Sequence, residues 1–222
     1  MKPLQVNYVQ ANGDCAILIY FKRHPQFKLR LHALAKYIRA QHIFGVVEVV
    51  PAFDSLMLVF NQPSGVDDKL MVSVKEACVQ SLGINVKPQL HEIPVCYHPD
   101  LAADLETVLK QTGLTLEQLI TVHSEPTYTV DFLGFLPGFA YIDGLPTQLN
   151  IPRKSKTSQN TPAGSIAIAN RQTGIYALDS PGGWHVIGRT PIKLIDWQTA
   201  HNIIYQPLDQ IRFKAMSYDA FI

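Results

Sequence analysis

The sequence predicts an α+β protein in which a small domain of mixed helices and strands precedes a β-barrel. Amphipathic helical periodicity ends near residue 122, whereas residues 132–191 hold 8 of the 13 glycines, 6 of the 15 prolines and only 7 charged residues. Glycine and proline alternating with short apolar runs, such as Ser165–Ala169, are typical of short strands joined by shaped turns. We expect one domain over residues 1–90 and a second over residues 91–222.

The first domain is expected to alternate strands with helices. Apolar, β-branched runs predict the strands, and apolar residues that recur on one helical face predict the helices. In chain order the expected elements are a strand at Cys15–Phe21, a helix from Phe27 to before Gly45, strands at Val46–Val50 and Leu56–Phe60, a helix at Asp67–Leu82, and strands at Ile84–Lys87 and Leu90–Tyr97. This β-α-β-β-α-β order is that of a split βαβ, ferredoxin-like unit.

Two further helices are expected before the barrel strands. Apolar residues between Leu101 and Leu109 define the first, which Gly113 would end. Thr115 and Gln118 match a T-x-x-Q capping box, which predicts a short helix from Leu116 to about Val122.

Charge and composition exclude several classes of protein. With 19 Lys and Arg against 18 Asp and Glu, the net charge of +1 gives no field to attract nucleic acid or an anionic membrane. The chain shows neither the apolar core of a signal peptide nor an apolar run of membrane-spanning length. Three widely spaced cysteines suit reduced thiols. We therefore expect a cytoplasmic protein.

An aromatic segment interrupted by proline and glycine is the first candidate for a ligand cleft. In Phe135-Leu-Pro137-Gly138-Phe139 the bend should turn at least one ring toward the surface, although core packing is the plain alternative. A second candidate is the turn that contains Gly182, Gly183 and Trp184. Adjacent glycines expose backbone N–H groups that can hold an anionic oxygen, although the same sequence also suits a simple tight turn.

Five polar side chains are further candidates. Arg153 and Arg189 stand in stretches with few charges, where each suits an anionic ligand or an internal salt bridge. His123 is a candidate general acid or base, with a packed or capping histidine as the alternative. Gln172 and Tyr176 suit hydrogen bonding to a ligand, or to the backbone alone.

Two apparent motifs are set aside. Residues 183–190 have the spacing of a Walker A loop, but Arg replaces Lys and Pro191 follows, where a helix should begin. His91, Cys96 and His98 lack the regular spacing of zinc ligands, so no metal site is expected.

A set of irregular motifs in fixed order resembles one family. The motifs are Phe132-x-Gly134-Phe135-x-Pro137-Gly138-Phe139-Ala140-Tyr141, Pro162-Ala-Gly-Ser165, Thr173-Gly-Ile-Tyr176, Ser180-Pro-Gly-Gly-Trp184 and Ile187-Gly-Arg-Thr-Pro191. They resemble the B subunits of bacterial 5-oxoprolinase, a group also labelled allophanate hydrolase subunit 1 or KipI. Weaker matches, such as Pro94-Val-Cys-Tyr97, extend the resemblance over nearly the whole chain.

The resemblance implies a cyclophilin-like β-barrel after the α/β domain. It also implies an ATP-dependent hydrolysis of 5-oxo-L-proline to L-glutamate, carried out with subunits A and C, with ATP as the co-substrate, accompanied by Mg²⁺, and no covalently bound cofactor. In this reaction ATP is expected to activate the amide oxygen as a phosphate. Arg153, Arg189 and the Gly182-Gly183 turn are our candidates for stabilising that intermediate.

The sequence leaves two alternatives to this function open. The family name KipI implies an inhibitor that binds a sensor histidine kinase without catalysis, and fold analogy alone suggests a prolyl isomerase. The sequence also departs from the family where Thr157, Ser158 and Asn160 replace basic residues and proline. Lys154 or Lys156 are candidates to supply the missing cationic contact.

Overall fold

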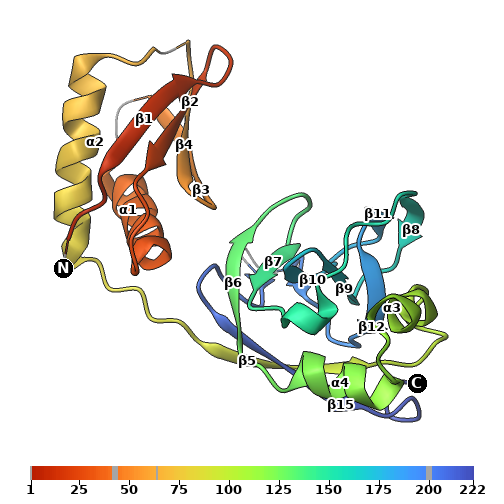
Figure 1. The fold of residues 1–222 in the computed structure, drawn as a ribbon. Coiled ribbons are helices and arrows are strands. Elements are labelled where there is room, and N and C mark those ends of the chain that lie inside the picture. Colours follow the sequence, from red (N-terminus) through yellow and green to blue (C-terminus); the bar gives the residue numbers. More distant parts are fainter. Residues whose placement is uncertain (1, 42–44, 64, 199–201) are drawn as a thin grey trace. The chain divides into compact units, whose positions relative to one another are not determined.

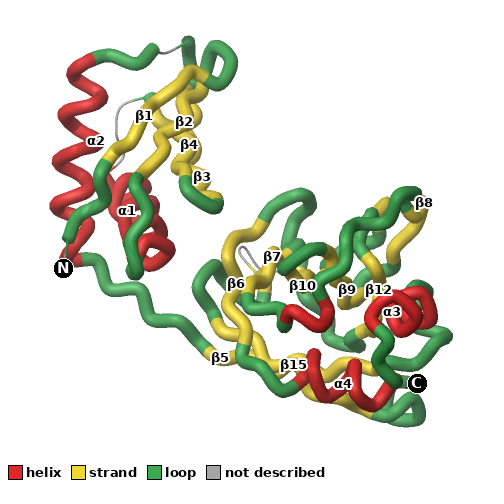
Figure 2. The backbone as a smooth tube through the Cα atoms, in the orientation of Figure 1, coloured by secondary structure: helices red, strands yellow, loops and turns green. Residues whose placement is uncertain are grey.

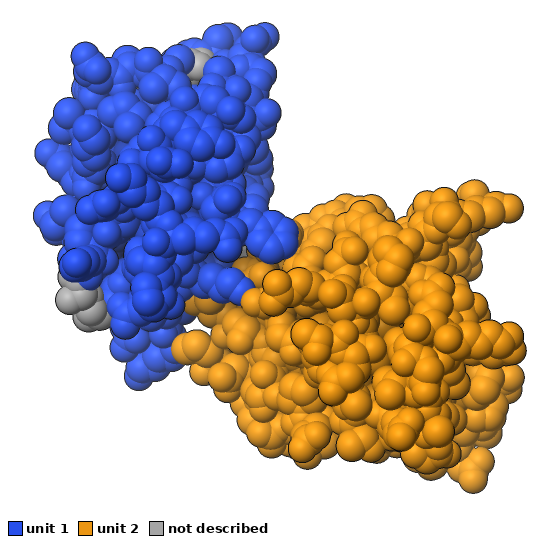
Figure 3. All heavy atoms as spheres, in the orientation of Figure 1, with its two compact units in different colours: residues 1–87 blue, residues 88–222 orange. Residues whose placement is uncertain are grey.

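The computed structural model describes residues 2–41, 45–63, 65–198 and 202–222, and divides the chain into two compact units at residues 87/88 (Figures 1 and 3). The helices and strands of the first unit are β1 (Val6–Ala11), β2 (Ala16–Phe21), α1 (Phe27–Gln41), β3 (Val46–Ala52), β4 (Ser55–Phe60), α2 (Asp68–Gln80) and the 3₁₀ helix η1 (Ser81–Gly83). None of the described helices has the length and apolar character needed to cross a membrane.

The first unit is a four-stranded antiparallel sheet with two helices. Its strand order is β1-β2-β4-β3, and the inward residues of β2 and β4 share one core with apolar residues of both helices. The α1 face that begins at Phe27 is buried as its periodicity predicts. Asp67 caps α2 by accepting a 2.7 Å hydrogen bond from the Leu70 backbone. These helices and the strands β2, β3 and β4 confirm the sequence prediction.

The split βαβ, ferredoxin-like order is not confirmed. An additional strand, β1, precedes the expected elements, and Ile84–Lys87 forms no strand. The segment Leu90–Cys96 forms β5, but this strand belongs to the barrel, where it pairs with a partner near the C-terminus. The unit is therefore ordered β-β-α-β-β-α. β1 has no apolar sequence pattern because it is an edge strand with mostly exposed residues.

The second unit is a closed barrel. Its remaining elements are α3 (Leu105–Thr112), α4 (Leu116–Ser124), β6 (Tyr128–Leu133), β7 (Ala140–Asp143), η2 (Thr147–Leu149), β8 (Ser158–Thr161), β9 (Ser165–Ala169), β10 (Gln172–Ile175), β11 (Ser180–Gly182), β12 (His185–Arg189), β13 (Ile195–Asp196), β14 (Asn202–Ile203) and β15 (Gln210–Met216). The barrel order is β10-β7-β6-β15-β5-β12-β9, with β9 paired to β10 (Figure 2). The barrel prediction is confirmed; its cyclophilin-like character stays a prediction.

One apolar core fills the barrel. All seven strands contribute to it, and α3 and α4 add Leu105, Val108 and Leu119. The capping box of α4 is present: the Gln118 backbone donates to the Thr115 hydroxyl at 3.3 Å, and the Thr115 backbone donates to Gln118 Oε1 at 2.9 Å. Outside the barrel order, β8 pairs with β11 and β13 pairs with β14, each as a two-stranded antiparallel ribbon.

Candidate functional site

An aromatic cluster covers the outer side of the barrel wall. In β9 the residues Ile166 and Ile168 belong to the interior core, so Ala167 and Ala169, which alternate with them, face outward. These small side chains leave room for the rings of the cluster, which are those of Phe139, Tyr176 and Trp184.

Edge-to-face contacts fix the rings of this cluster. The Phe139 ring centroid lies 4.8 Å from that of Tyr176 and 5.5 Å from that of Trp184, with interplanar angles of 76° and 87°. Gly174 of β10 forms the floor, since a Cβ there would stand 2.9 Å from the Trp184 ring and 3.0 Å from the Phe139 ring. The predicted lining residues Phe139, Tyr176 and Trp184 are therefore buried neighbours that form a packed wall.

Phe135 stands at the edge of this wall and differs from its neighbours in being 61% exposed. Its ring contacts those of Phe139 and Tyr176 edge-on, at centroid distances of 5.6 and 6.5 Å. Its φ of +69° is a backbone conformation that bulky residues rarely adopt. The tight turn at Pro137-Gly138 follows, where Gly138 also has positive φ and contacts Ala177 and Ile195 too closely for a side chain. The bend thus turns one ring outward, as predicted.

Arg153 brings a positive charge to the aromatic cluster. Its guanidinium carbon lies 5.8 Å from the centroid of the Trp184 ring, a cation–π arrangement, and the residue is exposed. Burial raises the pKa of Tyr176, and a hydrogen bond from the Trp184 backbone and the charge of Arg153 oppose that rise. Arg153 opposes the rise that burial causes in the pKa of Tyr141 as well. The Arg153 charge therefore acts on both phenols.

The two adjacent glycines have different roles. Gly182 lies in β11, and a Cβ there would stand 2.5 Å from the Tyr176 hydroxyl and 2.7 Å from that of Thr161. A Cβ at Gly183 would meet only Thr157, at 3.8 Å, and the Gly183 carbonyl accepts a 2.9 Å hydrogen bond from the Lys154 backbone. Close packing therefore explains why residue 182 is a glycine.

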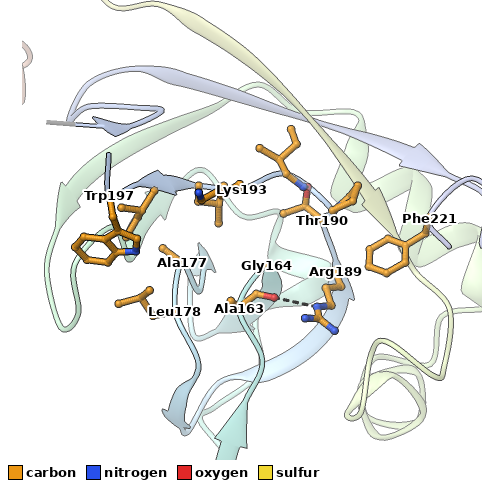
Figure 4. Close-up of a pocket in the computed structure, with 13 residues that line it drawn as sticks. Ala163, Gly164, Ala177, Leu178, Arg189, Thr190, Lys193, Trp197 and Phe221 are labelled. Atoms are coloured by element: carbon orange, nitrogen blue, oxygen red, sulfur yellow. Dashed lines mark hydrogen bonds between the residues drawn. The ribbon is translucent and has the colours of Figure 1, made fainter. Parts of the chain in front are cut away.

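Arg189 lies away from this cluster, beside a pocket of about 410 Å³ (Figure 4). It ends β12, whereas Trp184 immediately precedes the same strand. Arg189 Nε donates a 2.9 Å hydrogen bond to the Ala163 carbonyl, and Lys193, Trp197 and Phe221 also line the pocket. Neither Arg189 nor Arg153 forms an ion pair with any residue that the structure describes.

His123 is fully buried in the barrel core. Its ring stacks on that of Phe213 at 4.6 Å, and its nitrogens contact the Tyr97 hydroxyl at 2.8 Å and the Thr173 hydroxyl at 3.1 Å. Thr173 donates its own proton to the Ala167 carbonyl, so His123 Nε2 carries a proton and Nδ1 accepts from Tyr97. Burial lowers the pKa of His123 to about 3. This geometry favours the packed histidine over the general acid or base.

Gln172 begins β10, at the end opposite to Tyr176. Its amide nitrogen is buried and finds no hydrogen-bond partner among the described residues. Because residues alternate along a strand, Gln172 faces the same side of the barrel wall as Gly174 and Tyr176, at the other end of β10. Within the four described ranges of the chain, no group of three or more His, Cys, Asp and Glu side chains is arranged to hold a metal ion.

The comparisons with known proteins place the chain in a family. Residues 7–204 match the family described as "Carboxyltransferase domain, subdomain C and D". A protein of Bacillus subtilis, named as the B subunit of 5-oxoprolinase, is 34% identical over 94% of this chain and 92% of its own length. The protein of the same name from Haemophilus influenzae is 38% identical, over 85% of this chain and 87% of its own. The chain belongs to the family of 5-oxoprolinase B subunits.

One solved relative of this 5-oxoprolinase B-subunit chain is much longer. The protein designated TTHA0988 is 29% identical with a TM-score of 0.78, and the match covers 94% of this chain but 40% of that one. This chain thus spans about two fifths of that relative, in which the matching part is joined to a further segment.

The candidate residues that the sequence predicted lie in several places in the structure. The fold brings together Phe135, Pro137, Gly138, Phe139, Tyr176, Gly182, Gly183, Trp184 and Arg153 around the aromatic cluster. Arg189 lies at the pocket, His123 in the core, and Gln172 at the far end of β10. Three further lining residues of the pocket, Lys193, Trp197 and Phe221, belong to no sequence motif and come together only through the fold.

Proposed function

We propose that this chain is the B subunit of an ATP-dependent 5-oxoprolinase, which opens 5-oxo-L-proline to L-glutamate together with subunits A and C. The observation that carries the proposal is the family relationship, which extends over most of the chain and of its curated relatives. The name of these relatives itself means that they belong to multi-subunit hydrolases. ATP is the co-substrate of the complex, with Mg²⁺, and the cytoplasm is the proposed compartment.

The chemistry explains why ATP is required. The lactam of 5-oxo-L-proline is an unstrained amide, and resonance with the nitrogen makes its carbonyl carbon a poor electrophile. Transfer of the γ-phosphoryl group of ATP to the amide oxygen, with release of ADP, makes that carbon electrophilic. Water then adds to the carbon, the C–N bond breaks with the nitrogen leaving as the amine, and a second water hydrolyses the resulting acyl phosphate to glutamate and inorganic phosphate. Cationic groups then stabilise the negative charge that develops. Arg153 and Arg189 are cations without carboxylate partners among the described residues, and both are available for such a role.

We assign the Phe135 edge of the aromatic cluster to the contact with the C subunit. An exposed aromatic ring that rests on a rigid aromatic wall is typical of an interface anchor. Its positive φ persists only where the surrounding structure imposes it, which is frequent at functional sites. The additional length of the solved relative supports a partner for this unit. Arg153 stands beside Trp184 at the same cluster, as a cation available to the partner.

This assignment revises the single anion site expected from the sequence. Arg189 lies five residues beyond Trp184 along β12, and at a rise of about 3.3 Å per residue their Cα atoms are on the order of 16 Å apart. The two arginines therefore serve separate places.

Reconstitution tests the proposed function. The chain is purified with its candidate A and C partners, and glutamate and ADP release from 5-oxo-L-proline and ATP is measured. Full activity is expected only when all three proteins are present. A complete mixture without activity, or one equally active without this chain, contradicts the proposal. The alternative of a kinase inhibitor gains support if the chain instead suppresses autophosphorylation of a sensor histidine kinase.

A further inference from the structure

The pocket beside Arg189 has the size and shape of a site for a small molecule. Its volume of about 410 Å³ falls within the range typical of ligand pockets. Figure 4 shows Trp197 and Leu178 at one side and Arg189 with Phe221 at the other. Ala177 and Leu194 add apolar surface to the lining. This lining suits a compact ring that carries one polar group.

The charges that line this pocket, among the residues that the structure describes, are all positive. Arg189 and Lys193 are its ionisable residues, and no described Asp or Glu lines it. Since Arg189 uses Nε to hold the Ala163 carbonyl, its two Nη groups are left for an external acceptor. The pocket therefore favours an anionic occupant.

The hydrogen-bonding pattern distinguishes a carboxylate from a phosphate. The backbone N–H groups at the Arg189 end are already engaged: Ala163 donates to Asp179 Oδ1, Gly164 to the Tyr176 carbonyl, and Thr190 to the Gly164 carbonyl. A phosphate site is typically a nest of free backbone N–H groups, often with a metal ion. At the Arg189 end these three groups are therefore not free for a ligand, and the planar guanidinium fork of Arg189 matches the two oxygens of a carboxylate.

The pocket wall at Arg189 is rigid. Gly164 has φ +83°, and a Cβ there would overlap the Thr190 carbonyl oxygen, so the two backbone segments touch directly. The Ala163 carbonyl beside this contact fixes the direction of the guanidinium. Arg189 is thereby oriented before any ligand arrives, which reduces the ordering that binding requires.

We propose that this pocket binds the substrate, 5-oxo-L-proline, with its carboxylate held by Arg189 and Lys193 and its ring against the apolar lining. This inference rests on the proposed function for the identity of the ligand. It adds that substrate recognition lies on the B subunit, in a pocket whose lining residues Ala177 and Ile195 contact Gly138 of the turn that follows Phe135.

Calorimetric titration of the full chain with 5-oxo-L-proline tests the proposal. Binding is expected for 5-oxo-L-proline, whereas 2-pyrrolidinone, the same lactam without a carboxylate, should bind roughly tenfold more weakly or worse. Inorganic phosphate should not displace the substrate. The pocket assignment is overturned if the two lactams bind equally, if phosphate competes fully, or if 5-oxo-L-proline does not bind.

Variants locate the binding within the molecule. Arg189→Ala and Lys193→Ala should each weaken binding, by roughly tenfold for the arginine. Lys193 is exposed, so its variant should fold even if loss of the Ala163 hydrogen bond disturbs Arg189→Ala. Lys36→Ala, which removes an exposed lysine of α1, is the matched control and should bind as the wild type does. Unchanged binding in Lys193→Ala and Arg189→Ala contradicts the proposal. Binding that persists when the reconstituted complex is inactive contradicts only the proposed function.

Discussion

Lys154 Nζ lies 2.7 Å from Asp104 Oδ2, and both side chains are mostly buried, with 11% and 18% of their surfaces exposed. The same ammonium donates to the Ser158 hydroxyl at 2.7 Å, and the same carboxylate oxygen accepts from the Val186 backbone at 2.8 Å. This arrangement ties the start of α3 to β8 and β12. The Lys154 ammonium therefore already binds groups of the protein itself, and it does not replace the missing cationic contact of the family.

Lys154→Met should therefore act on stability. Without the Lys154 ammonium, the mostly buried Asp104 carboxylate loses the positive charge that offsets its own. Breaking a fully buried ion pair in this way costs about 3–5 kcal/mol. Because both groups retain some exposure, we expect a decrease of about 2–3 kcal/mol in the free energy of unfolding, measured by urea denaturation. Asp104→Asn in the same background should show non-additive coupling. A variant of wild-type stability that has lost only its activity in the reconstituted complex would contradict this interpretation.

Gly182 and Gly183 offer a matched pair of substitutions. Gly182→Ala forces a methyl group against the Tyr176 and Thr161 hydroxyls, so the aromatic cluster must shift. Overpacking of this kind costs about 1–3 kcal/mol. Gly183→Ala meets only Thr157, at an ordinary contact distance, and should change stability by less than about 0.5 kcal/mol. Near-ultraviolet circular dichroism should change only for Gly182→Ala; equal effects of the two variants would refute the packing explanation.

His123 predicts a pH dependence of stability. Its pKa is lowered by burial to about 3 in the folded chain, compared with about 6.5 when unfolded. The unfolded state therefore binds the proton first, so the stabilisation is complete above pH 6.5 and is lost as the pH falls toward 3. Between pH 6.5 and pH 5 this histidine should lower the free energy of unfolding by about 2 kcal/mol.

Urea denaturation across this pH range isolates the contribution of His123. His123→Gln, which keeps hydrogen-bonding capacity without a titrating group, should be less stable at pH 7 but should show a flatter profile. His98→Gln, at a side chain that is 40% exposed, should retain the wild-type profile. A His123→Gln profile as steep as that of the wild type would assign the pH dependence to other groups.

The sequence predicted those features of the fold and of the candidate site that depend on residues close together along the chain. The aromatic cluster was predictable because Phe135–Phe139 and Gly182–Trp184 each carry their bend and rings within a few positions, and the capping box of α4 spans only four residues. The separation of Arg153 from Arg189 was not predictable, since it depends on the direction of β12. β5 was recognised as a strand, but its partner β15 begins 120 residues later along the chain, and no local pattern reveals that pairing.

The exposed ring of Phe135 provides the last prediction. Phe135→Gly removes the side chain and relieves a positive φ, a conformation that costs an L-residue about 1–2 kcal/mol. This gain offsets the lost contacts with Phe139 and Tyr176, so the free energy of unfolding should change by less than about 1 kcal/mol. The affinity for the C subunit should nevertheless fall by roughly tenfold or more, because the interface loses its aromatic anchor.

Surface plasmon resonance with the immobilised C subunit separates these two effects. Val72→Ala, which removes apolar surface from the exposed side of α2, is the matched control and should bind the C subunit as the wild type does. A Phe135→Gly chain that keeps wild-type affinity would remove Phe135 from the interface. The strain at Phe135 would then lack a functional explanation, because nothing in the described part of the barrel unit requires a bulky side chain to stand exposed at positive φ.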